Sequence, residues 1–151
     1  MNYTSIYIDD LTRIQKAIPE LEDIEKYGLE VYYNGDRAMT EFKIKCYKSI
    51  TGKWHYIGIY TPDFLIIQRK DKKIYKIVIV ETKGEIYSND PKFREKRSFM
   101  QEHFTTINNK EFGYERFQYL YLEDSLPDIE RKIRTHKAIS DFFEEVIENG
   151  N

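Results

Sequence analysis

The sequence predicts an α/β protein in which helices flank a mixed central sheet, and three observations support this fold class. Segments rich in β-branched and aromatic residues follow one another between residues 29 and 83, which is typical of antiparallel strands. A helical pattern separates them from one later strand pattern at residues 115–124, and a strand–helix–strand step implies a right-handed parallel crossover. Helical patterns also begin and end the chain, which at 151 residues fits a single domain, residues 1–151, with an extra C-terminal helix.

The first helix is expected over residues 9–27. Its apolar residues recur at spacings of three and four and define one face: Leu11, Ile14, Ile18 and Leu21. Pro19 lies inside this pattern and is expected to kink the helix or to begin a second one. Gly28 is expected to end it.

Two strand segments follow the first helix. Residues 29–33 lead into Asn34-Gly35-Asp36, a turn that favours a hairpin with the alternating segment at residues 39–48. A second turn is expected at "SITGK", residues 49–53. The chain then continues into another strand segment.

The next two segments are the longest strand candidates. Residues 54–69 are expected to form one long strand or a strand with a bend at Pro62. After a turn at residues 70–73, the segment 74–83 carries an almost unbroken apolar run, Ile77 to Val80. Such a run is typical of a central strand that is covered on both faces.

The second half of the chain is expected to alternate helix, strand and helix. Asp90 and Pro91 are expected to cap and begin a helix. Its shared apolar face is formed by Phe93, Met100, Phe104 and Ile107. After the strand at 115–124, Asp124 or Ser125 is expected to cap a last helix that ends at Gly150. The apolar period of that helix is carried by Ile129, Ile133, Ile139, Phe143 and Ile147.

The composition indicates a folded chain without a strong overall charge. Hydrophobic residues make up 40% of the sequence and aromatic residues 15%, which excludes disorder by composition. The net charge is -2, so any contact with DNA requires a local basic patch. Cys46 is the single cysteine, which excludes a disulfide within the chain and argues against a cysteine-based zinc site. Without an apolar run of membrane-spanning length or a signal peptide, we expect a cytoplasmic protein that makes no membrane contact.

Charged residues at the ends of two neighbouring strand segments form the candidate site. Glu81 and Lys83 are two residues apart, so their side chains project to the same side of a strand. If the segments pair around Asp71, the numbers of facing residues sum to about 143, and Asp63 faces Val80, one position from Glu81. Two carboxylates and a carbonyl form an oxygen site that suits Mg²⁺ or Mn²⁺.

A lysine beside such an ion provides a compact positive charge where a phosphate would bind. These are the groups that metal-assisted phosphodiester hydrolysis requires. The acid-x-Lys triplet recurs elsewhere in this highly charged chain, so the spacing alone is unspecific. The alternative is a surface ion pair between Glu81 and Lys83 where the strand meets solvent.

The segment "TPDFLII…IVIVETKG" resembles the PD-(D/E)xK nuclease motif, and the order of predicted elements resembles the αβββαβ restriction-endonuclease-like core of that superfamily. Residues 29–85 are similar to the endonuclease domain at the C-terminus of type III restriction enzyme Res subunits. The resemblance implies a Mg²⁺-dependent DNA endonuclease in which Asp63, Glu81 and the Thr82 carbonyl bind the metal. It also implies that Lys83 is the catalytic lysine.

The superfamily often uses a further acid on its first helix. Four residues are candidates: Asp10, Glu20, Glu22 and Glu25, of which Glu25 extends the apolar stripe toward the sheet. Absence of this acid would leave a weak or inactive site, so the alternative is a catalytically inactive nuclease-fold module that binds nucleic acid or a partner protein. A docking role is a further alternative, and it requires an exposed apolar face near Phe142 and Phe143.

The resemblance also implies partners. Res subunits carry an upstream helicase region and work with a modification subunit, whereas this chain has no Gly-rich nucleotide-binding loop. It is therefore an excised domain or a stand-alone relative, and cutting both DNA strands would require a homodimer or a tandem complex. A basic cluster after Asp90 would either contact DNA phosphates or form a solvated face: Lys92, Arg94, Lys96 and Arg97.

Overall fold

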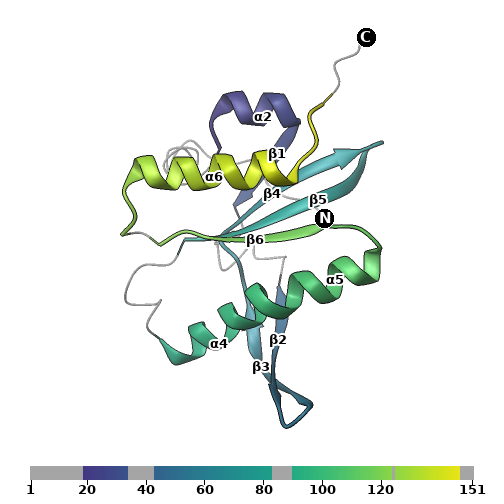
Figure 1. Cartoon of the computed structure of the whole chain (residues 1–151), viewed down its shortest axis with the longest axis vertical. Helices are drawn as coiled ribbons and strands as arrows, with labels where there is room; N and C mark the ends of the chain where they lie inside the picture. The colour runs from purple at the N-terminus through teal and green to yellow at the C-terminus, as the bar shows by residue number, and fades with distance from the viewer. Residues whose placement is uncertain (1–18, 34–42, 83–89, 124, 147–151) are drawn as a thin grey trace.

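The computed structural model describes residues 19–33, 43–82, 90–123 and 125–146. A four-stranded sheet in the order β1-β4-β5-β6 lies between two layers of helices (Figure 1). Its strands are β1 (Leu29–Tyr33), β4 (Phe64–Lys70), β5 (Lys73–Glu81) and β6 (Phe117–Tyr121). The pairs β1–β4 and β4–β5 are antiparallel and β5–β6 is parallel. The prediction of an α/β protein with a mixed sheet is confirmed.

The strand β5 occupies the interior of this sheet, between β4 and β6. Every side chain from Ile77 to Glu81 is buried. Apolar residues therefore cover both faces of the strand, as the unbroken apolar run predicts. The end of β5 places Glu81 where a charged residue has no direct access to solvent.

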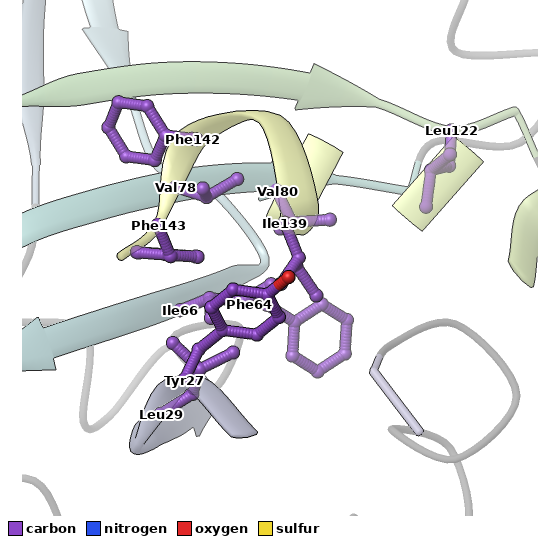
Figure 2. Packing of buried hydrophobic residues seen from close by; sticks show 10 residues of the cluster. All are labelled: Tyr27, Leu29, Phe64, Ile66, Val78, Val80, Leu122, Ile139, Phe142 and Phe143. Carbon is purple, nitrogen blue, oxygen red and sulfur yellow. The ribbon is translucent and has the colours of Figure 1, made fainter. Parts of the chain in front are cut away.

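One face of the sheet is covered by the helices α2 (Leu21–Tyr27) and α6 (Asp128–Phe142). Figure 2 shows how Tyr27 from α2 and Ile139 from α6 meet Val78 and Val80 of β5. The segment that follows α6 is tied back to the sheet by the buried Gln68, whose Nε2 donates to the carbonyl oxygens of Tyr27 at 2.8 Å and Glu144 at 2.6 Å.

The other face is covered by a continuous helical segment and by a two-stranded ribbon. The helical segment consists of α4 (Pro91–Phe99), a π-helical turn η1 (Met100–Phe104) and α5 (Thr105–Phe112). The ribbon consists of β2 (Ile44–Ile50) and β3 (Lys53–Tyr60). Figure 1 shows the ribbon extending away from the four-stranded sheet, past α4.

The strand partners differ from the expected hairpin between residues 29–33 and 39–48. Strand β1 pairs with β4, and β2 pairs with β3 through a turn at Thr51 and Gly52. Residues 34–42, including the Asn34-Gly35-Asp36 turn, lie outside the described residues. The expected bend at Pro62 is confirmed and is larger than a bend, because Pro62 lies in the break where the chain leaves the ribbon and enters the sheet. Proline has no N–H to continue a strand ladder.

The first helix was expected to present its apolar stripe to the sheet, and this is wrong for the part of the chain that is described. Leu21 is 68% exposed and Glu25 is exposed, whereas Asp23 and Tyr27 are buried. Helix α2 begins at Leu21, with Glu20 as its N-cap and Pro19 before it. A stripe counted across Pro19 therefore does not keep its phase. Gly28 ends the helix in the left-handed conformation, as expected.

The later helices confirm the predicted starts only in part. Asp90 caps α4 by accepting a hydrogen bond from the Lys92 N–H at 3.0 Å, and Pro91 begins the helix. The apolar face expected at Phe93, Met100 and Phe104 packs on the sheet, but Ile107 is exposed because the π-helical turn η1 changes the phase of the helix.

The last helix also departs from expectation at both ends. It is preceded by Pro127 in place of an Asp124 or Ser125 cap, and it ends at Phe142, well before Gly150. Ile129 is 70% exposed and Ile133 is also exposed, so the expected apolar period fails in the first half of α6. Residues 147–151 lie outside the described residues, and no described helix has the length and apolar character needed to cross a membrane.

The end of α2 generates a stability prediction. At Gly28, which has φ of 61°, an added Cβ would lie 2.7 Å from Val146 Cγ2, whereas at Gly113, with φ of 80°, it would meet nothing within 4 Å. A left-handed alanine costs about 1–2 kcal/mol, and overpacking costs about 1–3 kcal/mol more. We therefore expect Gly28→Ala to lower the free energy of unfolding in urea by more than Gly113→Ala does. In a Val146→Ala background the two losses should become similar, and equal losses in the wild-type background would contradict this packing.

Candidate functional site

The candidate site lies where β4 begins and β5 ends. Phe64 faces Val80 across the antiparallel pair, so continuing the pairing by one step places Asp63 opposite Glu81. The expected pairing of Asp63 with Val80 is therefore wrong by one residue. Near the turn, Lys70 faces Lys73, which gives the expected sum, but a β-bulge between Gln68 and Arg69 shifts the pairing for the rest of the strand.

Asp63 is fixed against the end of β5. Its Oδ2 accepts hydrogen bonds from the backbone N–H and the hydroxyl of Thr82, both at 3.0 Å. The Asp63 side chain is half-buried, and its Oδ1 makes no hydrogen bond to any residue that the structure describes. Asp63 is therefore held beside Glu81 through its Oδ2, while its Oδ1 is bonded to no described residue.

Glu81 is fully buried, and it is bound by a tyrosine from the ribbon. The Tyr60 hydroxyl donates to Glu81 Oε2 at 2.5 Å. The same hydroxyl lies 3.2 Å from the Tyr119 hydroxyl of β6. Burial of a carboxylate is costly unless polar groups compensate for lost water, and hydrogen bonds to charged groups contribute about 1.5–3 kcal/mol. The last residue of β3 thus stabilises the last residue of β5.

Both tyrosines remain protonated over the physiological pH range. Burial raises the pKa of Tyr60 well above its usual value of 10, and the nearby Glu81 charge raises it further. Burial also raises the pKa of Tyr119, while the hydrogen bond with Tyr60 and the charge of Arg97 oppose this shift. A protonated Tyr60 can act only as a hydrogen-bond donor toward the Glu81 carboxylate.

A positive charge from α4 lies on the same side of the sheet. The Arg97 guanidinium is 4.9 Å from the ring centroid of Tyr121, the residue of β6 that faces Glu81 in the parallel pair. It is also 5.8 Å from the ring of Phe93. The sequence indicates Arg97 only as one member of a basic cluster, and the fold places it against Tyr121, the residue paired with Glu81.

The remaining predicted site residues divide into two groups. Lys83 and Asp10 lie outside the described residues. Glu20, Glu22 and Glu25 are exposed on or beside α2. The buried acid of α2 is Asp23, and its Oδ2 lies 2.7 Å from Nδ1 of His136 on α6, in the helical layer on the opposite face of the sheet from the Glu81 side chain. Within the described part of the chain, no first-helix acid joins Asp63 and Glu81.

Sequence reasoning did not identify Tyr60 and Tyr119 as residues of the site. The position of Tyr60, three residues before Asp63 and next to a strand break, places it beside the same sheet end, but its sequence context does not indicate that its hydroxyl binds a carboxylate. Tyr119 is not indicated either, since its alternation with Phe117 and Tyr121 is that of a packed strand, and these three side chains do pack on the core.

The side chains at this site determine which metal ions it could bind. Asp63 and Glu81 are oxygen donors, which suit hard divalent cations. Among the described residues there is no group of three or more His, Cys, Asp or Glu side chains placed to bind an ion. Burial raises the pKa of the Cys46 thiol to about 11, so this cysteine is protonated at neutral pH and is not a thiolate ligand. The residues therefore fit a two-carboxylate oxygen site for Mg²⁺ or Mn²⁺.

The buried hydrogen bond generates a prediction for Tyr60→Phe. Removing the hydroxyl leaves the Glu81 carboxylate without this donor, so we expect the free energy of unfolding at pH 8 to fall by about 1–3 kcal/mol. Because the native pKa of Tyr60 is raised, its contribution is complete below the unfolded value of about 10 and is lost as pH rises above it. The difference between wild type and variant should therefore shrink above pH 10. Tyr56→Phe, at an exposed position of β3, is the matched control and should change stability little; a Tyr60→Phe protein as stable as this control would disprove the interaction.

Comparison with models of protein families, with curated proteins and with solved structures gave no match for this chain. Its function must therefore be inferred from the arrangement of Asp63, Glu81 and Tyr60 and from the fold that holds them.

Proposed function

We propose that this protein is a metal-dependent DNA endonuclease, with Mg²⁺ or Mn²⁺ as its cofactor, and that it is the cleavage domain or a stand-alone relative of a type III restriction enzyme Res subunit. The observation that carries the proposal is the meeting of Asp63 and Glu81 at the ends of adjacent antiparallel strands. Glu81 is fully buried, so it does not form the surface ion pair that was the alternative explanation for its position.

The connectivity of the described elements also supports the proposal. Helix α2 is followed by the antiparallel strands β1, β4 and β5, then by the α4–α5 segment, and then by β6 parallel to β5. This order is compatible with the αβββαβ core that the resemblance implies, if the β2–β3 ribbon is an insertion between the first and second core strands and α6 an addition at the end. The candidate residues lie at the ends of the second and third of those strands.

In the proposed mechanism the protein side chains bind the metal ion and position the attacking water and the phosphate. Asp63, Glu81 and the Thr82 carbonyl would bind the ion, and when bound a divalent cation makes a water molecule a stronger nucleophile and neutralises phosphate charge. Tyr60 keeps the Glu81 carboxylate in one orientation. Lys83, two residues after Glu81, is assigned to orient the attacking water or to stabilise the phosphate oxygens.

A second candidate function is a nuclease-fold module that binds nucleic acid or a partner protein without cleaving. It is favoured by the exposure of Glu20, Glu22 and Glu25, which leaves the carboxylate pair without an acid from α2 in the described residues. The docking version that uses Phe142 and Phe143 is wrong in its expected surface, because both side chains are buried in the core shown in Figure 2.

Cleavage assays on isosteric variants test the proposed mechanism. Asp63→Asn and Glu81→Gln remove one charge each, and Lys83→Ala removes the amine, so each should reduce DNA cleavage by about 100-fold or more. Glu111→Gln, at an exposed acid on α5, is the control and should cleave as wild type does. Wild-type rates in a folded Glu81→Gln protein would eliminate the mechanism.

Metal binding separates the two candidate functions. Mn²⁺ at 100 times its Kd would stabilise the native state by about 2.7 kcal/mol, which for a chain of this size raises Tm by roughly 5–10 °C. We expect this rise in the wild type and in Glu111→Gln, and a much smaller one in Asp63→Asn. A Tm that stays constant through millimolar Mn²⁺ would favour the inactive module.

A further inference from the structure

The β2–β3 ribbon has a charge that differs in sign from that of the whole chain. Residues 43–60 contain Lys43, Lys45, Lys48 and Lys53, one histidine, and neither Asp nor Glu. The complete chain has a net charge of -2. The ribbon is thus the kind of local basic patch that the composition requires for a nucleic-acid contact.

Three of these lysines are exposed and form no ion pair with an acid among the described residues. Lys48 is bound to Glu95 of α4 at 3.0 Å. Lys43, Lys45 and Lys53 make no ion pair or hydrogen bond anywhere in the described structure. Such lysines can exchange their mobile counterions for phosphates at little cost in lost protein contacts.

A fourth cation joins the ribbon from α4. Lys96 lies against Gly58 of β3, where an added Cβ would stand 3.2 Å from Lys96 Cε and 3.4 Å from its Nζ. Gly58, with φ of 131°, leaves the space through which this side chain passes. The positive charge therefore continues from the ribbon onto the helix that carries Arg97.

Large apolar side chains accompany the lysines. Trp54 is 51% exposed and Tyr56 is 57% exposed, and Ile50 and Ile59 are exposed as well. Trp54 is supported from behind by edge contacts with Phe99 and His103 at centroid distances of 6.3 and 5.1 Å. Because successive strand residues project to opposite faces, Trp54 lies on the face toward the α4–η1 segment, whereas Lys53 and its cross-strand partner Ile50 lie on the other face.

The ribbon joins the four-stranded sheet at the candidate site. Tyr60, its last residue, binds Glu81, and Asp63 follows three residues later. Eight residues of β3 at about 3.3 Å each reach about 25 Å outward from that point, a length comparable with about seven phosphates at 3.4 Å spacing. Figure 1 shows this projection beyond the sheet.

We propose that the β2–β3 ribbon is a DNA-binding arm, which contacts the phosphate backbone through Lys43, Lys45 and Lys53 and leads the bound strand to Asp63 and Glu81. The identification of the polyanion as DNA rests on the proposed endonuclease function. The competing explanation is that lysines on a two-stranded ribbon only prevent edge-to-edge association, and that explanation predicts no effect on DNA binding.

The test measures DNA binding without cleavage. Fluorescence anisotropy of labelled single-stranded and duplex DNA is recorded in EDTA over a range of salt concentrations, with the full chain. The test variant is Lys43→Ala/Lys45→Ala/Lys53→Ala. The control is Lys70→Ala/Lys73→Ala/Lys110→Ala, which removes the same charge from exposed positions on β4, β5 and α5. Circular dichroism verifies that both proteins are folded.

The ribbon variant should bind at least about tenfold more weakly near 0.1 M salt, and its log–log salt slope should fall by about 2 to 3 on duplex or by about 2 on single strands. The control should change binding less than about twofold. Wild-type affinity in the ribbon variant, equal weakening in both variants, or no DNA binding by the wild type would overturn the proposal. Of single-stranded and duplex DNA, the form that the wild type binds with lower affinity is the one that the ribbon does not contact.

The two proposals fail separately. Ribbon-dependent binding by a protein that never cleaves would keep the arm and reject the endonuclease. Cleavage and binding that are unchanged in the ribbon variant would keep the endonuclease and reject the arm.

Discussion

The arrangement of this protein depends on a charged carboxylate buried at the end of its central strand. Because β5 lies between β4 and β6, its last residue Glu81 is enclosed, and desolvation of its charge must be offset by polar contacts. The Tyr60 hydroxyl supplies one of them from a different sheet. This hydrogen bond joins the base of the ribbon to the four-stranded sheet, beside the packing of Ile44 and Cys46 on the core.

A single extra residue in β5 decides which side chains meet there. With the pairing seen beside the turn, Asp63 would face Val80 and its carboxylate would be offset from Glu81. The bulge between Gln68 and Arg69 shifts the ladder by one residue, so the two acids become opposite. The Thr82 N–H and hydroxyl then complete the attachment of Asp63. An irregularity more than ten ångströms along the strand, about five residues away at about 3.3 Å each, thus fixes the geometry of the site.

Local signals in the sequence predicted the elements well, and they failed where the answer depends on distant parts of the chain. The Asp90 cap, the Gly28 stop and the buried run of β5 follow from residue types alone. The pairing of β1 with β4 does not follow in this way, because alternation shows which face a side chain occupies and does not show which strand lies next to it. The bulge leaves no mark in the pattern, and Tyr60 looks the same in sequence whether it packs or donates to a carboxylate. Asp63 and Glu81 could be predicted as neighbours, whereas their support could not.

The charge distribution explains why a slightly acidic protein can still present a surface for a polyanion. At physiological ionic strength, charges separated by more than about 8 Å in solvent are largely screened from one another. The many acids of α2 and α6 lie in the layer beyond the sheet, so they contribute little to the field around Lys43, Lys45 and Lys53. Among the described residues, only Glu95 forms an ion pair with the ribbon, and it binds Lys48. The ribbon therefore presents lysines that pair with no acid among the described residues, and it ends at Tyr60, whose hydroxyl binds the carboxylate proposed to hold the metal.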